Sequence, residues 1–166
     1  QRPQGKRIFI QIRGLAERNE VMLNCADPEA EQQMKEEVDK VLRTGDSVGG
    51  IFEVVGHGVP PGLGTYAQWD ERLDGLLAGA VMSLQAVKAV EIGAGVTAAS
   101  SPGSAVHDEI GYVAATGFTR SRNNAGGIEG GVSNGEDIVV RGYLKPISTL
   151  RRPLQSVDFA TREPVK

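Results

Sequence analysis

RNNAGGIEGGVSNGEDIVVRGYLKPIST, residues 122–149, places a glycine-rich segment directly before an apolar strand. Its first fourteen residues hold five glycines and three asparagines, a composition typical of loops. The segment from Ile138 to Leu144 has the pattern of a strand, and Pro146 ends it because proline has no N–H to donate to a neighbouring strand. The sequence therefore predicts a glycine-rich loop attached to one strand, with Lys145 at the end of that strand.

Length and composition are those of a globular domain. The chain has 166 residues, of which 40% are hydrophobic, so we expect one domain-sized fragment, residues 1–166. The net charge of −3 gives no support to a nucleic-acid or membrane-surface role. Its one cysteine, Cys25, excludes an intramolecular disulfide, and with only two histidines the chain offers no metal site. Neither a long apolar run nor a signal pattern is present, so a cytoplasmic protein is expected.

Basic residues gather on the glycine-rich region. Residues 120–152 hold six lysines and arginines against three acidic residues, whereas acidic residues outnumber basic ones in the chain before them. Glycines let backbone N–H groups approach an anion, and asparagines tolerate left-handed turns. The spacing matches neither a Walker loop nor a dinucleotide fingerprint. The pattern indicates a loop suited to a small anionic or flat ligand.

Local patterns place the remaining elements. A helix is predicted between Asp27, a capping residue followed by proline, and Gly45, a typical helix stop. Strands are predicted at residues 6–14, 51–55, 90–92 and 138–144, and a strand, turn and returning strand at 154–166. Residues 97–137 show no sustained period, as functional or disordered loops do. These elements favour the α+β class, with antiparallel sheets and amphipathic helices.

A second helix is predicted from Asp70, as its N-cap, to Val90. Its apolar positions recur at helical spacing: Leu73, Leu76, Leu77, Ala80, Leu84 and Val87. Small residues form a second stripe, at Gly75, Gly79, Ser83 and Ala86. Because a glycine inside a helix costs about 1 kcal/mol relative to alanine, we expect something to lie against that stripe, and either a packed neighbour or a ligand fits.

Several long motifs occur in the order and spacing of one family. SRNNAGGIEGGVSNGEDIVVRGYLKPIST, GHGVPPGLGTY, a leucine-rich segment ending SLQAVKAVEIG, and GDSVGG resemble the central part of chorismate synthase. The resemblance is strong over residues 45–152 and weak in the flanks. Members of the family are about twice as long as this chain. The resemblance thus implies a fragment of the family's layered sheet–helix sandwich.

The resemblance also implies an activity. Chorismate synthases are lyases of the shikimate pathway, which convert 5-enolpyruvylshikimate 3-phosphate to chorismate and phosphate with reduced FMN. The family is typically homotetrameric, and whether the parent enzyme reduces its own flavin with NADPH stays open. The rival interpretation is a non-catalytic module that binds a flavin or nucleotide, or serves assembly, and merely shares the fold. Histidines encoded upstream would favour the enzyme, and their absence the module.

The family's flavin contacts, carried over position by position, fall on eight residues. They are Gln85, Ala86, Gly130, Lys145, Pro146, Ile147, Ser148 and Thr149. Lys145 would offer positive charge to FMN, Ser148 and Thr149 hydrogen-bond donors, and Gly130 clearance for the ring system. The alternative is a structural loop that braces the strand at 138–144. Asn123 and Asn124 would either orient the loop or touch the ligand.

Other parts of the family's active site have no counterpart in the sequence. Its two active-site histidines and its arginine-rich substrate segments occur upstream, and a further flavin-contacting arginine occurs downstream. His57 and His107 belong to different motifs and do not fill those roles. No catalytic residue is therefore assigned, and the isolated chain is expected to be inactive.

Overall fold

The computed structural model describes residues 23–25 and 27–166, which separate into two compact units. Unit 1 comprises the described part of residues 1–49 together with residues 145–166, and unit 2 comprises residues 50–144. The predicted strand at 6–14 lies outside the described residues. That the whole chain forms one domain-sized fragment stays a prediction.

Unit 1 contains the predicted amphipathic helix, α1, Pro28–Thr44. The Asp27 carboxylate accepts the Glu29 N–H at 2.9 Å, and Gly45 ends the helix with φ 73°, a left-handed conformation that suits glycine. Both boundaries confirm the capping pattern. Of the apolar positions on α1, Met34 and Leu42 are 45% and 51% exposed.

The carboxyl-terminal segment of unit 1 is a small hairpin. Strand β8, Ser156–Val157, pairs antiparallel with β9, Pro164–Val165, which confirms the predicted strand, turn and returning strand. The Asp158 carboxylate holds the turn by accepting the N–H groups of Thr161 and Ala160, and these bonds lower the pKa of that carboxyl.

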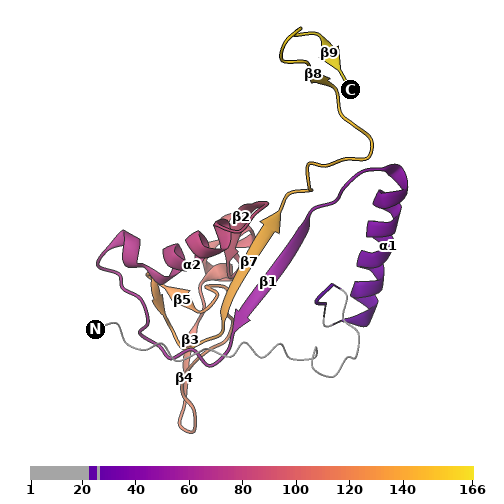
Figure 1. The fold of residues 1–166 in the computed structure, drawn as a ribbon. Coiled ribbons are helices and arrows are strands. Elements are labelled where there is room, and N and C mark those ends of the chain that lie inside the picture. The colour runs from indigo at the N-terminus through magenta and orange to yellow at the C-terminus, as the bar shows by residue number, and fades with distance from the viewer. Residues whose placement is uncertain (1–22, 26) are drawn as a thin grey trace, which may run out of the picture. The chain divides into compact units, whose positions relative to one another are not determined.

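Unit 2 is built on a three-stranded antiparallel sheet (Figure 1). Its strands are β1, Gly50–Gly56, β2, Val87–Ile92, and β7, Ile138–Leu144, in the order β1-β7-β2. β7 has the predicted bounds and takes the central place, although it comes last in the chain. Its burial alternates along the strand, as expected when one face of a sheet is covered.

Helix α2, Leu73–Met82, packs against β2 and β7 and covers that face (Figure 1). The core consists of Val59, Ile128, Ile138 and Val140, with Leu73, Leu77, Val81, Val90 and Ile92 partly buried against it. Four of these nine side chains come from β2 and β7, and three from α2. Each Å² of apolar surface buried between them contributes about 25 cal/mol, and this contribution stabilises the packing of the helix on the sheet.

The prediction of one helix from Asp70 to Val90 was wrong at both ends. Asp70 lies in a short 3-10 helix, Trp69–Glu71, and α2 begins after Arg72 without a side-chain cap. At the other end the Ser83 hydroxyl donates to the Ala80 carbonyl, and the chain turns into β2. The apolar spacing of the helix continues to Val87, which lies in β2. Pairing with β7 determines the conformation there.

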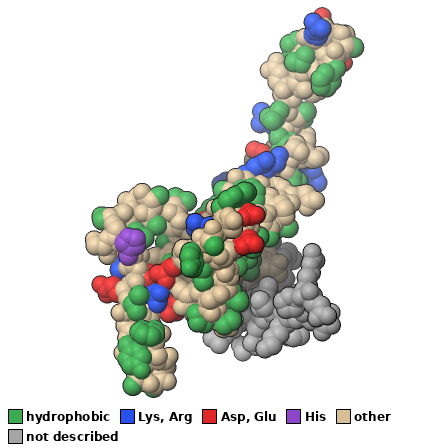
Figure 2. Space-filling model, turned by 90° about the vertical axis from the view of Figure 1, so that its left-hand side faces the viewer, with side chains coloured by type: hydrophobic (Ala, Val, Ile, Leu, Met, Phe, Trp, Pro, Cys, Tyr) green, Lys and Arg blue, Asp and Glu red, His purple; other side chains and the backbone are tan. Residues whose placement is uncertain are grey.

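Residues 97–137 contain only short elements, in agreement with their lack of a sustained period. They are α3, Gly95–Ala99, α4, Gly103–Val106, β3, Ile110–Val113, β4, Gly117–Arg120, β5, Ile128–Glu129, and β6, Val132–Ser133. β3 pairs with β4 and β5 with β6, each as a hairpin. The β3–β4 hairpin projects from the unit and exposes apolar side chains (Figures 1 and 2).

The turn after β2 and the glycine-rich loop meet backbone to backbone. Gly93 has φ 58° and donates its N–H to the Val139 carbonyl at 2.9 Å, while the Gly126 carbonyl accepts the Val139 N–H at 3.1 Å. A Cβ on Gly93 would overlap the Asn124 carbonyl oxygen, and one on Gly126 would overlap Gly93. Only glycine permits this contact, which fixes the loop to the sheet.

The second face of the sheet carries a charged row across its three strands. Arg141 on β7 lies opposite Glu53 and Glu91, with Nε 2.7 Å from the Glu53 carboxylate and Nη1 3.5 Å from that of Glu91. Glu91 is 8% exposed and also accepts a hydrogen bond from the Tyr143 hydroxyl and the Val96 N–H. The Tyr143 bond, followed by the Val96 bond, lowers the pKa of Glu91, and the same carboxylate raises the pKa of Tyr143.

We predict that Gly93→Ala destabilises the fold much more than Gly130→Ala. Gly130 at the β5–β6 turn has φ 61°, close to the 58° of Gly93, but no atom lies within 4 Å of the position of its Cβ. Both changes carry the left-handed strain of about 1–2 kcal/mol, and only Gly93→Ala adds overpacking of about 1–3 kcal/mol. Urea unfolding of the two variants measures the difference, and equal losses would show that the close approach is unimportant.

We predict that Tyr143→Phe reduces the acid sensitivity of the fold. A carboxyl whose folded pKa lies below the ordinary 4.5 contributes stability above that value and loses it as the pH falls through the lowered pKa. Removing the Tyr143 hydroxyl removes the main cause of the shift, so wild type and variant should differ at pH 7 and converge in acid. Urea unfolding between pH 7 and pH 3 tests this, with Tyr112→Phe, which changes an exposed tyrosine, as the control.

Candidate functional site

The two asparagines of the opening motif brace the glycine-rich loop, Asn123 within it and Asn124 against α4. The Asn123 amide donates to the Asp137 carbonyl at 2.8 Å and accepts the Gly127 N–H at 2.8 Å. The Asn124 amide donates to the Val106 carbonyl at 2.9 Å. Of the two roles that the sequence left open, the structure shows the first: both side chains orient the loop.

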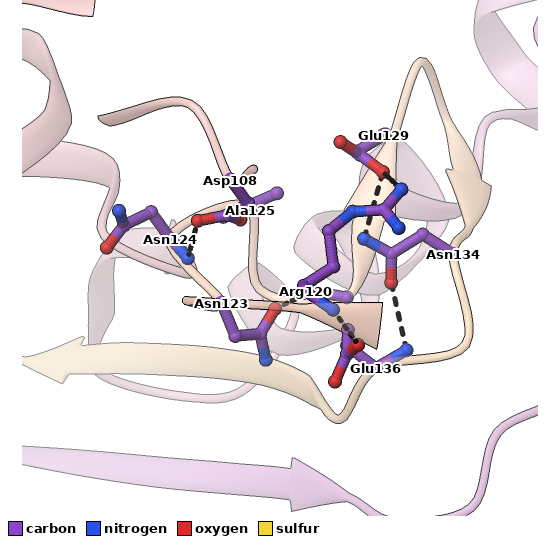
Figure 3. A network of polar contacts seen from close by, with 9 residues as sticks. Asp108, Arg120, Asn123, Asn124, Ala125, Glu129, Asn134 and Glu136 are labelled. Atoms are coloured by element: carbon purple, nitrogen blue, oxygen red, sulfur yellow. Dashed lines mark hydrogen bonds and ion pairs between the residues drawn. The ribbon is translucent and has the colours of Figure 1, made fainter. Parts of the chain in front are cut away.

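Asp108 holds the same loop from the other side. Its carboxylate accepts the N–H groups of Asn124 and Ala125, each at 2.9 Å (Figure 3). Arg122 reaches back across the loop and donates to the carbonyls of Ala105 and His107 at 2.9 and 3.0 Å. Arg122 is thus engaged by backbone oxygens, and the loop is a braced structure, which favours preorganised binding.

The β5–β6 hairpin turns at Gly130–Gly131, where Gly130 is exposed and Gly131 is buried. Both glycines have positive φ, 61° and 87°, as a two-residue turn of type I′ requires. The Gly131 carbonyl accepts the Leu73 N–H at 2.9 Å, so the turn is attached to the start of α2. Gly130 itself has open space around it, which leaves its backbone accessible to a flat ligand.

A network of acidic, amide and guanidinium groups lies beside this turn (Figure 3). Arg120, at the end of β4, donates Nη2 to the Glu129 carboxylate at 2.5 Å. The Asn134 side chain donates to the same carboxylate at 3.0 Å. The Glu136 carboxylate accepts the backbone N–H of Arg120 at 3.2 Å. Sequence reasoning missed the Arg120–Glu129 pair, because the partners lie in different hairpins and no local pattern links them.

The two histidines occupy separate places in unit 2. His57 follows β1 and its Nδ1 lies 2.8 Å from the carboxylate of Asp137, which precedes the paired strand β7. Both side chains are 46% exposed. His107 ends α4, where its carbonyl accepts a hydrogen bond from Arg122. His57 is thus linked to the start of β7 through its side chain, whereas the contact of His107 is made by its backbone.

Gln85 and Ala86 lie in the turn between α2 and β2, and their predicted place inside the helix was wrong. Ala86 has φ 70°, a conformation uncommon for a residue with a Cβ. The small-residue stripe is therefore shorter than predicted, since only Gly75 and Gly79 belong to α2. No described atom lies within 4 Å of a Cβ built on Gly79, so the described chain does not cover the stripe there.

Residues 145–149 belong to unit 1 and form neither a helix nor a strand. All five side chains are exposed, and the Ile147 carbonyl accepts a hydrogen bond from the Ser47 hydroxyl at 2.7 Å. The eight predicted flavin contacts thus fall into three residues of unit 2 and five of unit 1. That they form one binding site stays a prediction.

Unit 1 also contains a cavity of about 390 Å³ at the end of α1. It is lined by Thr44, Gly45, Asp46, Leu150, Arg152, Pro153, Leu154, Gln155 and Lys166, and so includes none of the predicted flavin contacts. In the described part of the chain, no cluster of histidine, cysteine and acidic side chains has the arrangement of a metal site.

Comparison with known proteins identifies the family. A family model described as chorismate synthase matches residues 5–166. Chorismate synthase of Koribacter versatilis is 73% identical over 157 residues, which cover 92% of this chain and 40% of the relative. That of Acidobacterium capsulatum is 69% identical and covers 95% of this chain and 42% of the relative. This chain therefore spans about 40% of the length of the curated relatives it matches.

A solved structure agrees with these matches. A crystal structure of chorismate synthase superposes with a TM-score of 0.73 and 52% identity, over 76% of this chain and 38% of the other. This similarity confirms the predicted α+β class with antiparallel sheets and helices. The family model covers nearly the whole sequence, and the motifs around the glycine-rich loop lie within it. The chain belongs to the chorismate synthase family.

Proposed function

We propose that this chain contributes to a chorismate synthase, the lyase that converts 5-enolpyruvylshikimate 3-phosphate to chorismate and phosphate. The observation that carries the proposal is the 73% identity with a relative named chorismate synthase, over 92% of this chain. The proposed partners are that substrate and further copies of the enzyme, as a homotetramer. The proposed location is the cytoplasm. Among the described residues, no helix is both long and apolar enough to cross a membrane.

The proposed cofactor is reduced FMN, which would supply electron density transiently as the phosphate leaves. Two features of the described residues fit such a ligand. Gly130 leaves free space above a braced turn, which suits a flat ring. Lys145 is exposed and has no ion-pair partner among the described residues, so its ammonium group is available to an anion.

The roles proposed for this chain are binding and orientation. Lys145 would pair with an anionic part of the flavin, and Ser148 and Thr149 would donate hydrogen bonds beside it. Gln85 and Ala86 would contribute backbone groups at the turn after α2. Pro146 and Ile147 would complete the contact segment that follows β7. No described residue is proposed as a general acid or base, since His57 and His107 belong to other motifs than the active-site histidines of the family.

We predict that the purified 166-residue chain binds FMN but forms no chorismate from reduced FMN and 5-enolpyruvylshikimate 3-phosphate. The proposed flavin contacts lie within the chain, whereas no catalytic group has been assigned in it. Quenching of flavin fluorescence measures binding, and chorismate is detected by its absorbance. Absence of saturable FMN binding would contradict the proposed flavin site, and turnover would contradict the proposed division of roles.

We predict that Lys145→Met weakens FMN binding about ten- to a hundredfold, the equivalent of a charge-assisted hydrogen bond of roughly 1.5–3 kcal/mol. The ligand-free melting temperature should hardly change, because an exposed lysine contributes little to folding. Lys88→Met, which removes the charge of an exposed lysine on β2, is the matched control. If Lys145 only braces the loop, melting will fall while the affinity of the folded protein stays normal.

A further inference from the structure

We propose that Arg120 is a positioning residue, which fixes the Gly130 turn in the place where it meets the flavin. The inference rests on the proposed function, because it takes Gly130 as a flavin contact. Arg120 itself touches the Glu129 carboxylate, and Glu129 is the residue directly before Gly130 (Figure 3). The ion pair therefore acts on the turn through one covalent neighbour.

The Arg120 side chain is largely shielded from solvent although its guanidinium has one carboxylate partner. It is 12% exposed, and its Nε is buried without a hydrogen-bond partner among the described residues. An arginine in such surroundings carries a desolvation penalty, and the pair with Glu129 offsets part of it. Glu129 is 43% exposed, so the pair joins a largely shielded guanidinium to a more exposed carboxylate.

The β5–β6 hairpin is too short to be stable without contacts to its neighbours, and the Arg120–Glu129 pair is one of these contacts. Each strand has only two residues, and a hairpin of that length has little stability of its own. On one side the backbone holds it, through the Leu73 N–H to the Gly131 carbonyl at 2.9 Å and through the bridge between Gly64 and Val132. On the other side the contacts of Glu129 with Arg120 and Asn134 hold it, and Arg120 supplies the charged one.

The pair also connects two parts of the loop region. Arg120 ends β4, and its backbone N–H donates to the carboxylate of Glu136, which lies just before β7. A shift of the β3–β4 hairpin would therefore move Glu129 and, with it, the Gly130 turn. The charge balance points the same way. The Arg120 guanidinium neutralises the Glu129 carboxylate, so its removal leaves negative charge beside the surface proposed for an anionic cofactor.

The test compares wild type, Arg120→Gln, Glu129→Gln and the double variant in the 166-residue chain. FMN affinity per folded molecule is measured by fluorescence titration, and the motion of the Gly130 and Gly131 amides by NMR relaxation without flavin. Each single variant should weaken FMN binding about tenfold, the factor that corresponds to 1.4 kcal/mol. The double variant should be no weaker than the singles, since residues that act through one contact are not additive.

Two further variants separate positioning from other roles. Arg120→Lys keeps the charge and one donor, and should restore most of the affinity. Lys88→Gln removes a positive charge from an exposed side chain of β2 without touching Glu129, and should leave the affinity near that of wild type. Equal weakening by Lys88→Gln would indicate a general field effect and would overturn the inference. So would a melting temperature that falls in Arg120→Gln while FMN affinity per folded molecule is unchanged.

The NMR measurement keeps the inference apart from the proposed function. If wild type binds no FMN, the proposed flavin site fails, and the motion of the turn still decides about Arg120. Greater amide motion at Gly130 in Arg120→Gln and Glu129→Gln, with none added by Lys88→Gln, supports the positioning role. A folded Arg120→Gln variant whose Gly130 amide is as rigid as in wild type refutes it.

Discussion

The antiparallel pairing of β7 with both β1 and β2 is the constraint on which unit 2 depends. β7 comes last of the three along the chain and still lies between the other two. Neither edge strand can reach its place before the chain has supplied the centre, so the sheet rests on contacts between residues far apart in sequence. Such long-range pairing is costly in loop entropy and gains stability only when the core beneath it is complete.

The same pairing determines where the glycine-rich loop lies. Val139, at the start of β7, donates its N–H to the Gly126 carbonyl and accepts the Gly93 N–H. One residue of the central strand thus binds both the loop before it and the turn after β2. The loop cannot move away from the sheet without breaking these bonds, and side chains on either glycine would separate them. The placement of Gly130 at the surface follows from this anchoring and from the Gly131 bond to α2.

Local sequence patterns predicted those helix and strand boundaries that are determined by residues close by in the sequence. The cap at Asp27, the stop at Gly45 and the proline after β7 each act within a few residues, and the structure confirms all three. The second helix failed where the cause was distant. Val87 continues the helical spacing, but its partner Leu144 on β7 draws it into a strand. The Arg120–Glu129 pair escaped notice for the same reason, since it joins two hairpins that only the folded chain brings together.

The glycines of the opening motif serve two purposes that their sequence alone does not separate. Gly126, Gly127 and Gly131 are crowded by the protein's own atoms, so their missing side chains allow the chain to pack against itself. Gly130 stands apart, because it has positive φ and nothing near the place of a Cβ. Most of the exposed backbone expected for a ligand is therefore used in folding. What remains for a ligand is a single turn, held by backbone bonds on one side and by the Arg120 side chain on the other, and the proposed flavin contact depends on that support.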